Sequence, residues 1–537
     1  MQIFDYVIVG AGSAGCVLAY RLAEKGRSVC VLEAGPRDSN PYIRIPTGFM
    51  KTYNNPKLTW AFNHQGTEHT NHRSIPFIQG KLLGGSSAVN GMIYSRGQSS
   101  DYDLWARMGN EGWDYASVLP YFRRNECYMG GGDDAYRGRN GRLMVDRFPR
   151  PDALCDSFIK AAQETGIEPN TDYNGSHQNG VGYAQATIFK GKRCSAAHSY
   201  LHPAKKRFGV VVHTDATVRR VLIENGRATG VTYSLGQSDT THTVKARACT
   251  IISAGTVNTT KLLQLSGLGP AALLQSLNIP VVADIPGLGE NLADHYAARI
   301  VVRAKAGVDT VNGRASGLPL AREVLSWAMG KPSILAMTSA AVYAFCKTDP
   351  EHAENDYLLS FTPASFREGM TRQLDDVPGF TSGAYRVRPE SRGFIRLQSS
   401  HFKDAPIVNP NYLAAESDRH ILITALKHST RILNAPAMSH VFERQLFPKE
   451  ILNTDDEWLD FIKQFGLTTF HLVGTCKMGP VSDPMAFVDP RLRVHGIDGL
   501  RVVDASFMPT TPSGNTNAAT LMIAEKAADM ILADETH

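Results

Sequence analysis

The sequence lacks cysteine pairs with metal-binding or haem-attachment spacing. Its eight cysteines are scattered over 537 residues and none forms C-x-x-C, so we expect no metal site and reduced thiols in a cytoplasmic protein. No stretch comes near the roughly 18 apolar residues of a membrane span. No basic segment followed by an apolar one opens the chain, so no signal peptide is expected either. Peripheral association with the inner membrane stays open.

Strong charge of one sign is also scarce. The formal net charge is +5, and the short basic run at residues 204–207 is typical of a solvated helix end rather than a nucleic-acid site. We therefore expect no nucleic-acid partner. Repeats and low-complexity tracts are missing as well. A chain of 537 residues is too long for one core, so we expect two domains, interleaved along the sequence.

What the chain does have is a dinucleotide-binding pattern in its first 35 residues. Residues 4–9 are typical of a buried strand, and the glycine turn at residues 10–15 follows at once with the spacing G-x-G-x-x-G. Apolar residues at helical spacing occupy residues 16–25. A second strand over residues 28–32 ends on Glu33, 18 residues after Gly15. This order of strand, turn, helix and acid is the context that the fingerprint requires.

The chemistry of a bound dinucleotide explains these residue types. Gly10 permits the tight turn, Gly12 lets the backbone approach a pyrophosphate, and Gly15 lets the helix lie close to the strand. The helix N-terminus offers free N–H groups and the positive end of its dipole. Glu33 would accept hydrogen bonds from the ribose hydroxyls. The alternative is a glycine turn in some other βα unit.

Further elements follow from hydrophobic periodicity. We predict strands over residues 209–213, 218–223, 228–233, 248–254 and 499–503, and helices around 261–265 and over 518–532. The more heterogeneous segment 300–465 shows strand-like runs at 356–361 and 393–397 and helix-like runs at 417–433 and 455–465. Because the strand and helix near the C-terminus again flank a glycine-rich turn, the nucleotide domain is predicted to use both ends of the chain.

Four stretches together carry a resemblance to a known family. They are the N-terminal fingerprint, residues 80–92 (GKLLGGSSAVNGM), residues 255–269, and the C-terminal pair HLVGTCKMG (471–479) and GNTNA (514–518). In these features the chain resembles the glucose–methanol–choline (GMC) oxidoreductases, and most of all the bacterial choline-dehydrogenase-like alcohol dehydrogenases of that family. The resemblance runs nearly from end to end.

The resemblance implies an α/β fold with a Rossmann-like FAD-binding domain assembled from discontinuous segments, and a substrate-binding domain with an antiparallel sheet and helices. We expect the FAD domain to comprise residues 1–155, 190–300 and 466–537. The substrate domain would then comprise residues 156–189 and 301–465. The cofactor implied is FAD, with its ring at the junction of the two domains.

The family motifs also assign cofactor-binding residues in this sequence. The ADP half would be held by Gly10, Gly12, Ser13, Ala14, Glu33 and Ala34, with Val218 meeting the adenine through its backbone. The pyrophosphate and ring would be lined by Gly84, Asn90, Gly91 and Met92. Asp504 and Ala505 would lie by the pyrophosphate and the ribityl chain, and Asn517 near the pyrimidine end of the ring.

Two departures from the family pattern are informative. Some members tether FAD through a histidine just before the asparagine of the second motif, where this chain has Val89, so FAD should be bound non-covalently. Choline-acting relatives carry a glutamate a few residues before a phenylalanine, and this glutamate faces the trimethylammonium group of the substrate. An ungapped alignment on Phe345 puts Ala341 at that position, which favours a neutral substrate over choline.

His471 and Asn515 are the predicted catalytic pair. An alcohol gives up its hydroxyl proton only to a well-placed base, and imidazole titrates near neutral pH. By family position His471 would be this base, and Asn515 would orient the substrate oxygen. The alternatives are a structural role for His471 and a helix N-cap for Asn515. For His295, in the stretch 291–295, a structural role is favoured.

The predicted function is therefore FAD-dependent oxidation of a neutral, primary alcohol to the aldehyde. His471 would remove the proton, flavin N5 would take the hydride, and a quinone, a cytochrome or O₂ would accept the electrons. The alternatives are choline dehydrogenase, a flavin-bound lyase of the hydroxynitrile type, and an NAD-dependent dehydrogenase built on the same fingerprint. The sequence gives neither the particular alcohol nor the oligomeric state.

Overall fold

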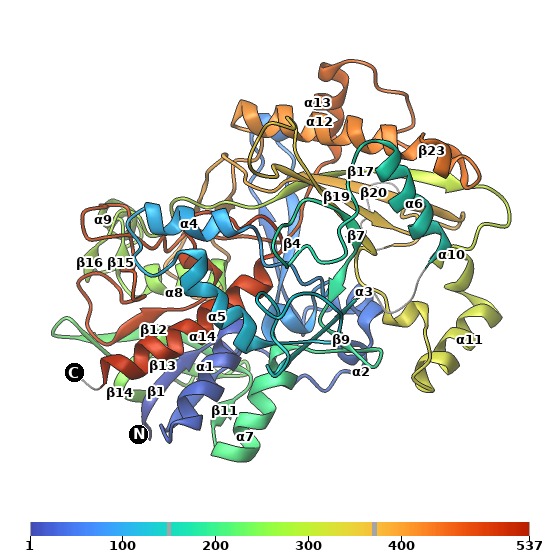
Figure 1. The fold of residues 1–537 in the computed structure, drawn as a ribbon. Helices are drawn as coiled ribbons and strands as arrows, with labels where there is room; N and C mark the ends of the chain where they lie inside the picture. Colours follow the sequence, from blue (N-terminus) through green and yellow to red (C-terminus); the bar gives the residue numbers. More distant parts are fainter. Residues whose placement is uncertain (1, 148–151, 368–372, 536–537) are drawn as a thin grey trace.

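Two seven-stranded sheets organise the protein (Figure 1). The computed structural model describes residues 2–147, 152–367 and 373–535. All eight cysteines lie within these ranges, and none of them forms a disulfide there. Within the same ranges no helix combines the length and apolarity needed to cross a bilayer.

The first sheet has the order β11-β2-β1-β14-β13-β12, with β25 pairing with β14. Its strands are β1 (Gln2–Val9), β2 (Val29–Leu32), β11 (Val211–His213), β12 (Ala216–Glu224), β13 (Arg227–Leu235), β14 (His242–Ile252) and β25 (Leu500–Val502). The strands β11, β2, β1, β14 and β25 run parallel, whereas β12 and β13 are antiparallel additions. Strand β2 is a buried apolar run, and β1 and β14 each end on four buried residues, as expected for strands covered on both faces.

Helices follow the carboxyl ends of three parallel strands. Helix α1 (Ser13–Glu24) follows β1 and α8 (Thr256–Leu265) follows β14, while α14 (Thr516–Asp534) comes after β25 by way of a loop. Helix α14, red in Figure 1, packs along α1, blue, although the two come from opposite ends of the chain. In doubly wound sheets, ligands bind in the crevice just beyond the carboxyl ends of the parallel strands.

The second sheet is antiparallel and has the order β23-β17-β20-β19-β18-β7, with β24 pairing with β17. Its strands are β7 (Gly180–Tyr183), β17 (Tyr296–Ala304), β18 (Val342–Cys346), β19 (Tyr357–Thr362), β20 (Gly379–Arg386), β23 (Phe442–Phe447) and β24 (Leu467–Thr468). Helices α6 (Ala153–Glu164) and α12 (Glu416–Leu433) cover one face. Along β17, Ala298 and Ile300 point into this core, so Ala297 and Arg299 belong to the opposite face.

The remaining elements are short or lie at the periphery. The strands are β3 (Thr59–His64), β4 (Ile75–Gly80), β5 (Glu126–Tyr128), β6 (Leu143–Arg147), β8 (Gln185–Ala186), β9 (Ile188–Phe189), β10 (Lys192–Arg193), β15 (Leu268–Gly269), β16 (Ala283–Asp284), β21 (Phe394–Arg396) and β22 (Ile407–Asn409). The helices are α2 (Pro41–Arg44), α3 (Phe49–Thr52), α4 (Ser99–Arg107), α5 (Tyr115–Asn125), α7 (His202–Phe208), α9 (Ala271–Ser276), α10 (Val311–Arg314), α11 (Gly317–Ala328) and α13 (Asp455–Phe465).

Most elements predicted from periodicity are confirmed to within three residues at each end, but β14 begins at His242 rather than at 248 and α8 at Thr256 rather than at 261. Helices α12 and α13 differ from the predicted 417–433 and 455–465 by at most one residue at an end. The hairpin β12–β13 turns at Asn225 and Gly226, which both have positive φ. By contrast, β17, β18 and β20 of the second sheet were not predicted.

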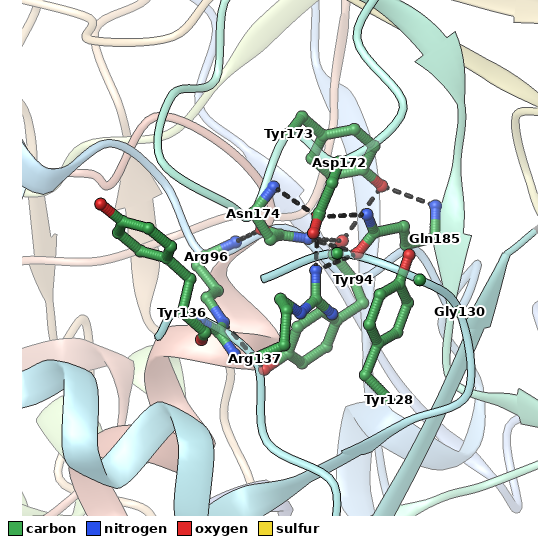
Figure 2. A network of polar contacts seen from close by, with 12 residues as sticks. Tyr94, Arg96, Tyr128, Gly130, Tyr136, Arg137, Asp172, Tyr173, Asn174 and Gln185 are labelled. Atoms are coloured by element: carbon green, nitrogen blue, oxygen red, sulfur yellow. Dashed lines mark hydrogen bonds and ion pairs between the residues drawn. The ribbon is translucent and has the colours of Figure 1, made fainter. Parts of the chain in front are cut away.

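A buried ionic network connects β5, which begins at Glu126, to β8 (Figure 2). Glu126 accepts hydrogen bonds from Arg137 Nε at 2.9 Å and Nη2 at 3.0 Å, and it also pairs with Arg96. Arg137 Nη1 donates to Asp172 at 2.6 Å and to Gln185 at 2.8 Å. Both guanidinium groups and Glu126 are almost completely buried. The two positive and two negative charges balance, which is what makes their burial tolerable.

Removing the central carboxylate should therefore destabilise the protein. We expect Glu126→Gln to lower the free energy of unfolding by about 3–5 kcal/mol, since two buried guanidinium groups lose their shared counter-ion. The matched control is Asp134→Asn, which removes the exposed ion pair with Arg139 and should cost at most ~1 kcal/mol. Urea unfolding measures both, and equal midpoints for the two variants would contradict the prediction.

Candidate functional site

One cavity of about 500 Å³ lies between the two sheets and is lined by residues of both. Fifteen of the sixteen predicted site residues line it: Gly10, Gly12, Ser13, Ala14, Glu33, Ala34, Asn90, Gly91, Met92, Val218, His471, Asp504, Ala505, Asn515 and Asn517. The fold thus brings together residues that are up to about 500 positions apart in the sequence. Among the described residues, no group of three or more His, Cys, Asp or Glu is placed to hold a metal ion.

The glycine turn after β1 is closed by backbone packing. Gly10 has a φ of +99°, and a Cβ there would lie 2.4 Å from the carbonyl oxygen of Ser253. A Cβ on Gly15 would lie 2.0 Å from the carbonyl oxygen of Gly10. Larger residues at these two positions would therefore push the turn away from the sheet.

Three helix N-termini, those of α1, α8 and α14, meet at the cavity. None has a side-chain cap on its first N–H groups, and none carries an acidic residue in its first turn. Ser13 at the start of α1 donates to Asn517 at the start of α14, with the oxygens 2.7 Å apart. Converging uncapped N–H groups and helix dipoles make this part of the cavity attractive to an anion.

Glu33 lies at the foot of this anion-attracting region. Its two carboxylate oxygens each accept a backbone N–H, from Gly35 and from Ala11, both at 2.9 Å. Burial nevertheless raises the pKa of Glu33 to about 7, because desolvation outweighs these hydrogen bonds. The carboxylate therefore changes its charge near neutral pH.

Gly84 is the predicted residue that does not line the cavity. Its N–H donates to the carbonyl oxygen of Ala11 at 2.8 Å, and a Cβ on the adjacent Gly85 would lie 2.7 Å from Gly12 Cα. Gly84 thus stabilises the glycine turn at residues 10–15 by a backbone hydrogen bond and does not contact the cavity itself.

Asp504 and Asn90 are largely occupied by protein partners. Asp504 Oδ2 accepts from Gly255 N at 2.9 Å and from Thr259 Oγ1 at 2.5 Å, which holds the start of α8 beside β25. Asn90 Oδ1 accepts from Met92 N at 3.1 Å and from Arg193 Nη1 at 2.7 Å. Both side chains therefore shape the backbone that surrounds the cavity.

His471 and Asn515, predicted as a pair, are in direct contact. Asn515 Nδ2 lies 3.0 Å from His471 Nε2, and Tyr343 donates its hydroxyl to Asn515 Oδ1 at 3.3 Å. Asn515 does stand at the N-cap position of α14, but its side chain makes no capping hydrogen bond. Its amide faces the imidazole instead.

The hydrogen bonds assign the tautomer of His471. His295 Nε2 lies 2.8 Å from the carbonyl oxygen of Val387, which can only accept, so Nε2 carries the proton. Burial lowers the pKa of His295 to about 4, so the ring is neutral and its Nδ1 is an acceptor. His471 Nδ1, 2.9 Å away, is then the donor. His471 Nε2 is left without a proton, beside Asn515.

Two further groups hold the His471 ring and backbone. Thr469 Oγ1 donates to the carbonyl oxygen of His295 at 3.2 Å and can accept from His471 Nδ1 at 2.8 Å. Asp294 accepts the backbone N–H of His471 at 2.7 Å and the hydroxyl of Thr468 at 2.5 Å. Burial, together with the neighbouring His295, places the pKa of His471 well below its usual value. The ring is consequently neutral and able to accept a proton at neutral pH.

The second sheet supplies the opposite wall of the cavity. Arg299, Gly383, Ser360 and Tyr343 lie in one row across β17, β20, β19 and β18. Burial lowers the pKa of Arg299 to about 10, which still leaves it charged at neutral pH. Ala341, by contrast, packs in the hydrophobic core and does not line the cavity. The expectation that position 341 faces the substrate is therefore not supported by its location.

Sequence reasoning missed several residues around His471. His295 was assigned a structural role, yet it makes a direct ring contact with His471. Tyr343 and Tyr385 also line the cavity near the imidazole. For His295 the signal was the family stretch 291–295; the two tyrosines carry no local motif, and only the pairing of distant strands brings them here.

Comparison with known proteins agrees with this arrangement. A family model described as GMC oxidoreductase matches residues 4–297, and a second of the same description matches residues 389–524. The chain is 39% identical over 534 residues to an alcohol dehydrogenase (acceptor) of Pseudomonas putida, covering 99% of this chain and 96% of that protein. It is 38% identical over 530 residues to an oxygen-dependent choline dehydrogenase of Brucella ovis, covering 98% and 95%.

A solved structure shares the fold over its full length. The crystal structure of pyridoxine 4-oxidase from "Mesorbium loti" superimposes with a TM-score of 0.88 at 28% identity, covering 99% of each chain.

Proposed function

The chain belongs to the GMC oxidoreductase family, whose members bind FAD and oxidise CH–OH donors, and on this premise we propose that His471 is the base for oxidation of a neutral primary alcohol. The observation that carries the proposal is the unprotonated Nε2 of a neutral imidazole that faces the cavity beside Asn515. FAD, when bound, supplies the acceptor for the hydride from the alcohol carbon.

The residues around the cavity suit FAD chemically. The uncapped N-termini of α1, α8 and α14 would receive a pyrophosphate. Glu33 retains free lone pairs for the ribose hydroxyls, and Ala34 and Val218 line the same end of the cavity. Val89 also lines the cavity and offers no nucleophile, which supports non-covalent binding.

We propose that proton removal runs through His471 Nε2. An imidazole held with Nδ1–H toward His295 and Thr469 presents its Nε2 lone pair to the substrate hydroxyl. The protonated ring would keep its Nδ1–H contacts, so it need not turn during the reaction. Asn515 Nδ2 would then donate to the substrate oxygen, with Tyr343 fixing the amide through Oδ1.

The charged side chain that the second sheet contributes to the cavity disfavours a cationic substrate. Arg299 is charged and lines the cavity, and the carboxylates among the described lining residues are Glu33 and Asp504, both in the first domain. Among the lining residues that the structure describes, the second sheet offers a quaternary ammonium no carboxylate. Choline remains the alternative because of the 38% identity to a choline dehydrogenase.

The finer assignments are part of the same proposal. We assign residues 1–155, 190–300 and 466–537 to the FAD domain and residues 156–189 and 301–465 to the substrate domain. The cytoplasm is the proposed location, and a quinone, a cytochrome or O₂ the proposed electron acceptor.

FAD affinity should depend on the charge of Glu33. Ribose hydroxyls favour the ionised carboxylate, so FAD binding releases a proton at pH values below the pKa of about 7. We therefore expect the Kd for FAD to fall as the pH rises toward 7 and to level off above it. In Glu33→Gln the Kd should be roughly 10–100-fold higher and lose this pH dependence, because a hydrogen bond to a charged group is lost. Titration of the flavin-free protein with FAD measures both; the same pH dependence in the variant would contradict the assignment.

Replacing the base should slow reduction of the bound flavin. In His471→Ala we expect anaerobic reduction by substrate to be about 10²–10⁴-fold slower, the usual contribution of a general base. Stopped-flow absorbance measures the rate, and His202→Ala, which removes a half-exposed imidazole paired with Asp38, is the control that should leave it unchanged. An unaltered rate in His471→Ala would exclude the role.

The role of His295 can be tested by measuring kcat/KM as a function of pH. Burial lowers the pKa of His471, and at acid pH, where His295 is itself protonated, repulsion between the two rings lowers it further, so His295→Gln should raise that pKa. The fall of kcat/KM on the acid side would then move to higher pH. If His295 had a purely structural role, the acid-side fall of kcat/KM would stay at the same pH in His295→Gln.

Substrate preference tests the charge argument. Neutral primary alcohols should give a higher kcat/KM than choline, assayed with an artificial acceptor and with O₂. Repulsion between the guanidinium of Arg299 and the ammonium of choline, taken as ~8 Å apart at an effective dielectric constant of ~20, is roughly 2 kcal/mol. In Arg299→Gln the ratio of kcat/KM for the neutral alcohol to kcat/KM for choline should therefore fall by about tenfold or more. Choline as the preferred substrate of the unchanged enzyme would favour the alternative function.

A further inference from the structure

Helix α11 turns its apolar side to solvent. Leu318, Leu325 and Val324 are 76%, 59% and 47% exposed, and Met329 just after the helix is 54% exposed. None of the helix residues Gly317–Ala328 is buried. Figure 1 shows α11 projecting from the lower right of the molecule, away from both sheets.

The orientation of the helix is fixed by polar contacts on its inner side. Trp327 Nε1 donates to the carbonyl oxygen of Gly191 at 2.6 Å, and Glu323 accepts from Ile334 N at 2.9 Å. Exposed apolar residues then recur on the outer side, at positions 318, 321, 324, 325, 328 and 329. An ordinary surface helix shows the reverse arrangement, with its apolar stripe toward the core.

Basic side chains surround this stripe. Arg322 and Lys331 are exposed on and just after the helix, and Lys190 and Lys192 are exposed on either side of Gly191, which receives Trp327. Arg314 pairs with Asp309 and lies 3.5 Å from Glu323, so these three residues together carry one negative charge, against the four positive charges of the basic side chains. The rim is thus positive.

The α11 patch is also close to the cavity. The chain passes from α11 through the short helix η5 (Ile334–Ala336) to Ser339 and Ala340, which line the cavity. Thr47, in the short helix η1 (Pro46–Gly48), donates to the carbonyl oxygen of Leu335, and the cavity-lining Phe49 follows directly. A surface bound to α11 would therefore lie next to the part of the cavity wall that contains Phe49, Ser339 and Ala340.

We propose that the α11 patch, defined as Leu318, Ala321, Val324, Leu325, Ala328 and Met329 with the rim Lys190, Lys192, Arg322 and Lys331, docks peripherally on an anionic lipid bilayer. An apolar helix face lying in the interface, with lysine and arginine beside acidic headgroups, is the usual arrangement of such contacts. A second copy of the chain fits less well. A two-fold contact would bring the basic rims together, and the ten residues of the patch fall short of the ~20–30 per side of a stable interface.

Vesicle flotation of the FAD-loaded protein tests this proposal independently of the catalytic one. We expect the protein to float with vesicles of phosphatidylglycerol and phosphatidylcholine, and to float less with phosphatidylcholine alone or at high salt. Leu325→Glu should reduce the partition coefficient at least tenfold, because one buried leucine is lost and a negative charge is added. Val481→Glu, at an 89% exposed valine elsewhere, is the matched control and should float like the unchanged protein.

Two readouts separate the possible outcomes. Turnover with a soluble acceptor and the thermal midpoint should be unchanged in Leu325→Glu, since residue 325 does not line the cavity. Failure of the unchanged protein to float with anionic vesicles would overturn the proposal, as would equal flotation of Leu325→Glu. A dimer in size-exclusion chromatography that Leu325→Glu dissociates, without vesicle binding, would assign the patch to a second copy instead.

Discussion

Close packing of backbone on backbone at the fingerprint turn is the constraint on which the site depends. Gly10 lies against Ser253, and Gly85 lies against Gly12, at distances that leave no space for a Cβ. Three segments far apart in the sequence are thereby held in contact. Their contact sets the position of the α1 and α8 N-termini, and through Ser13 and Asn517 also that of α14. Without this backbone packing, the N–H groups at the N-termini of α1, α8 and α14 would not converge on the cavity.

The orientation of His471 depends in turn on the second sheet. His295 immediately precedes β17, and its proton is fixed by the carbonyl oxygen of Val387 just beyond β20. The tautomer of the imidazole is thus decided by a backbone acceptor that never approaches the substrate. This explains how the proposed base can come from a loop: its ring is held on Nδ1 by His295 and Thr469, and its backbone by Asp294.

The elements of the first sheet were predicted from the sequence better than those of the second sheet, for physical reasons. Strands β1 and β14 each end on a short buried run directly before a glycine turn, and α12 has a clear helical period, so their signals are local. Strand β17 instead interrupts its apolar residues with Arg299, which lines the cavity, and with Arg303, which forms a half-exposed ion pair with Glu443. The cavity-facing tyrosines 343 and 385 likewise follow no motif. Their proximity to His471 depends on the register of β18 to β20, which is set by long-range pairing.

The positive groups around the cavity favour negative charge beside the helix N-termini and beside the proposed base. Glu33 and Asp504, the carboxylates among its described lining residues, are both held by backbone N–H groups. Opposed to them are three helix N-termini, Arg299, and Lys261, whose pKa burial lowers to about 8. A low-dielectric cavity concentrates such a field. It would stabilise a pyrophosphate at one end and, at the other, the negative charge that develops on the substrate oxygen as His471 removes the proton. The same field therefore serves both cofactor binding and the proposed chemistry.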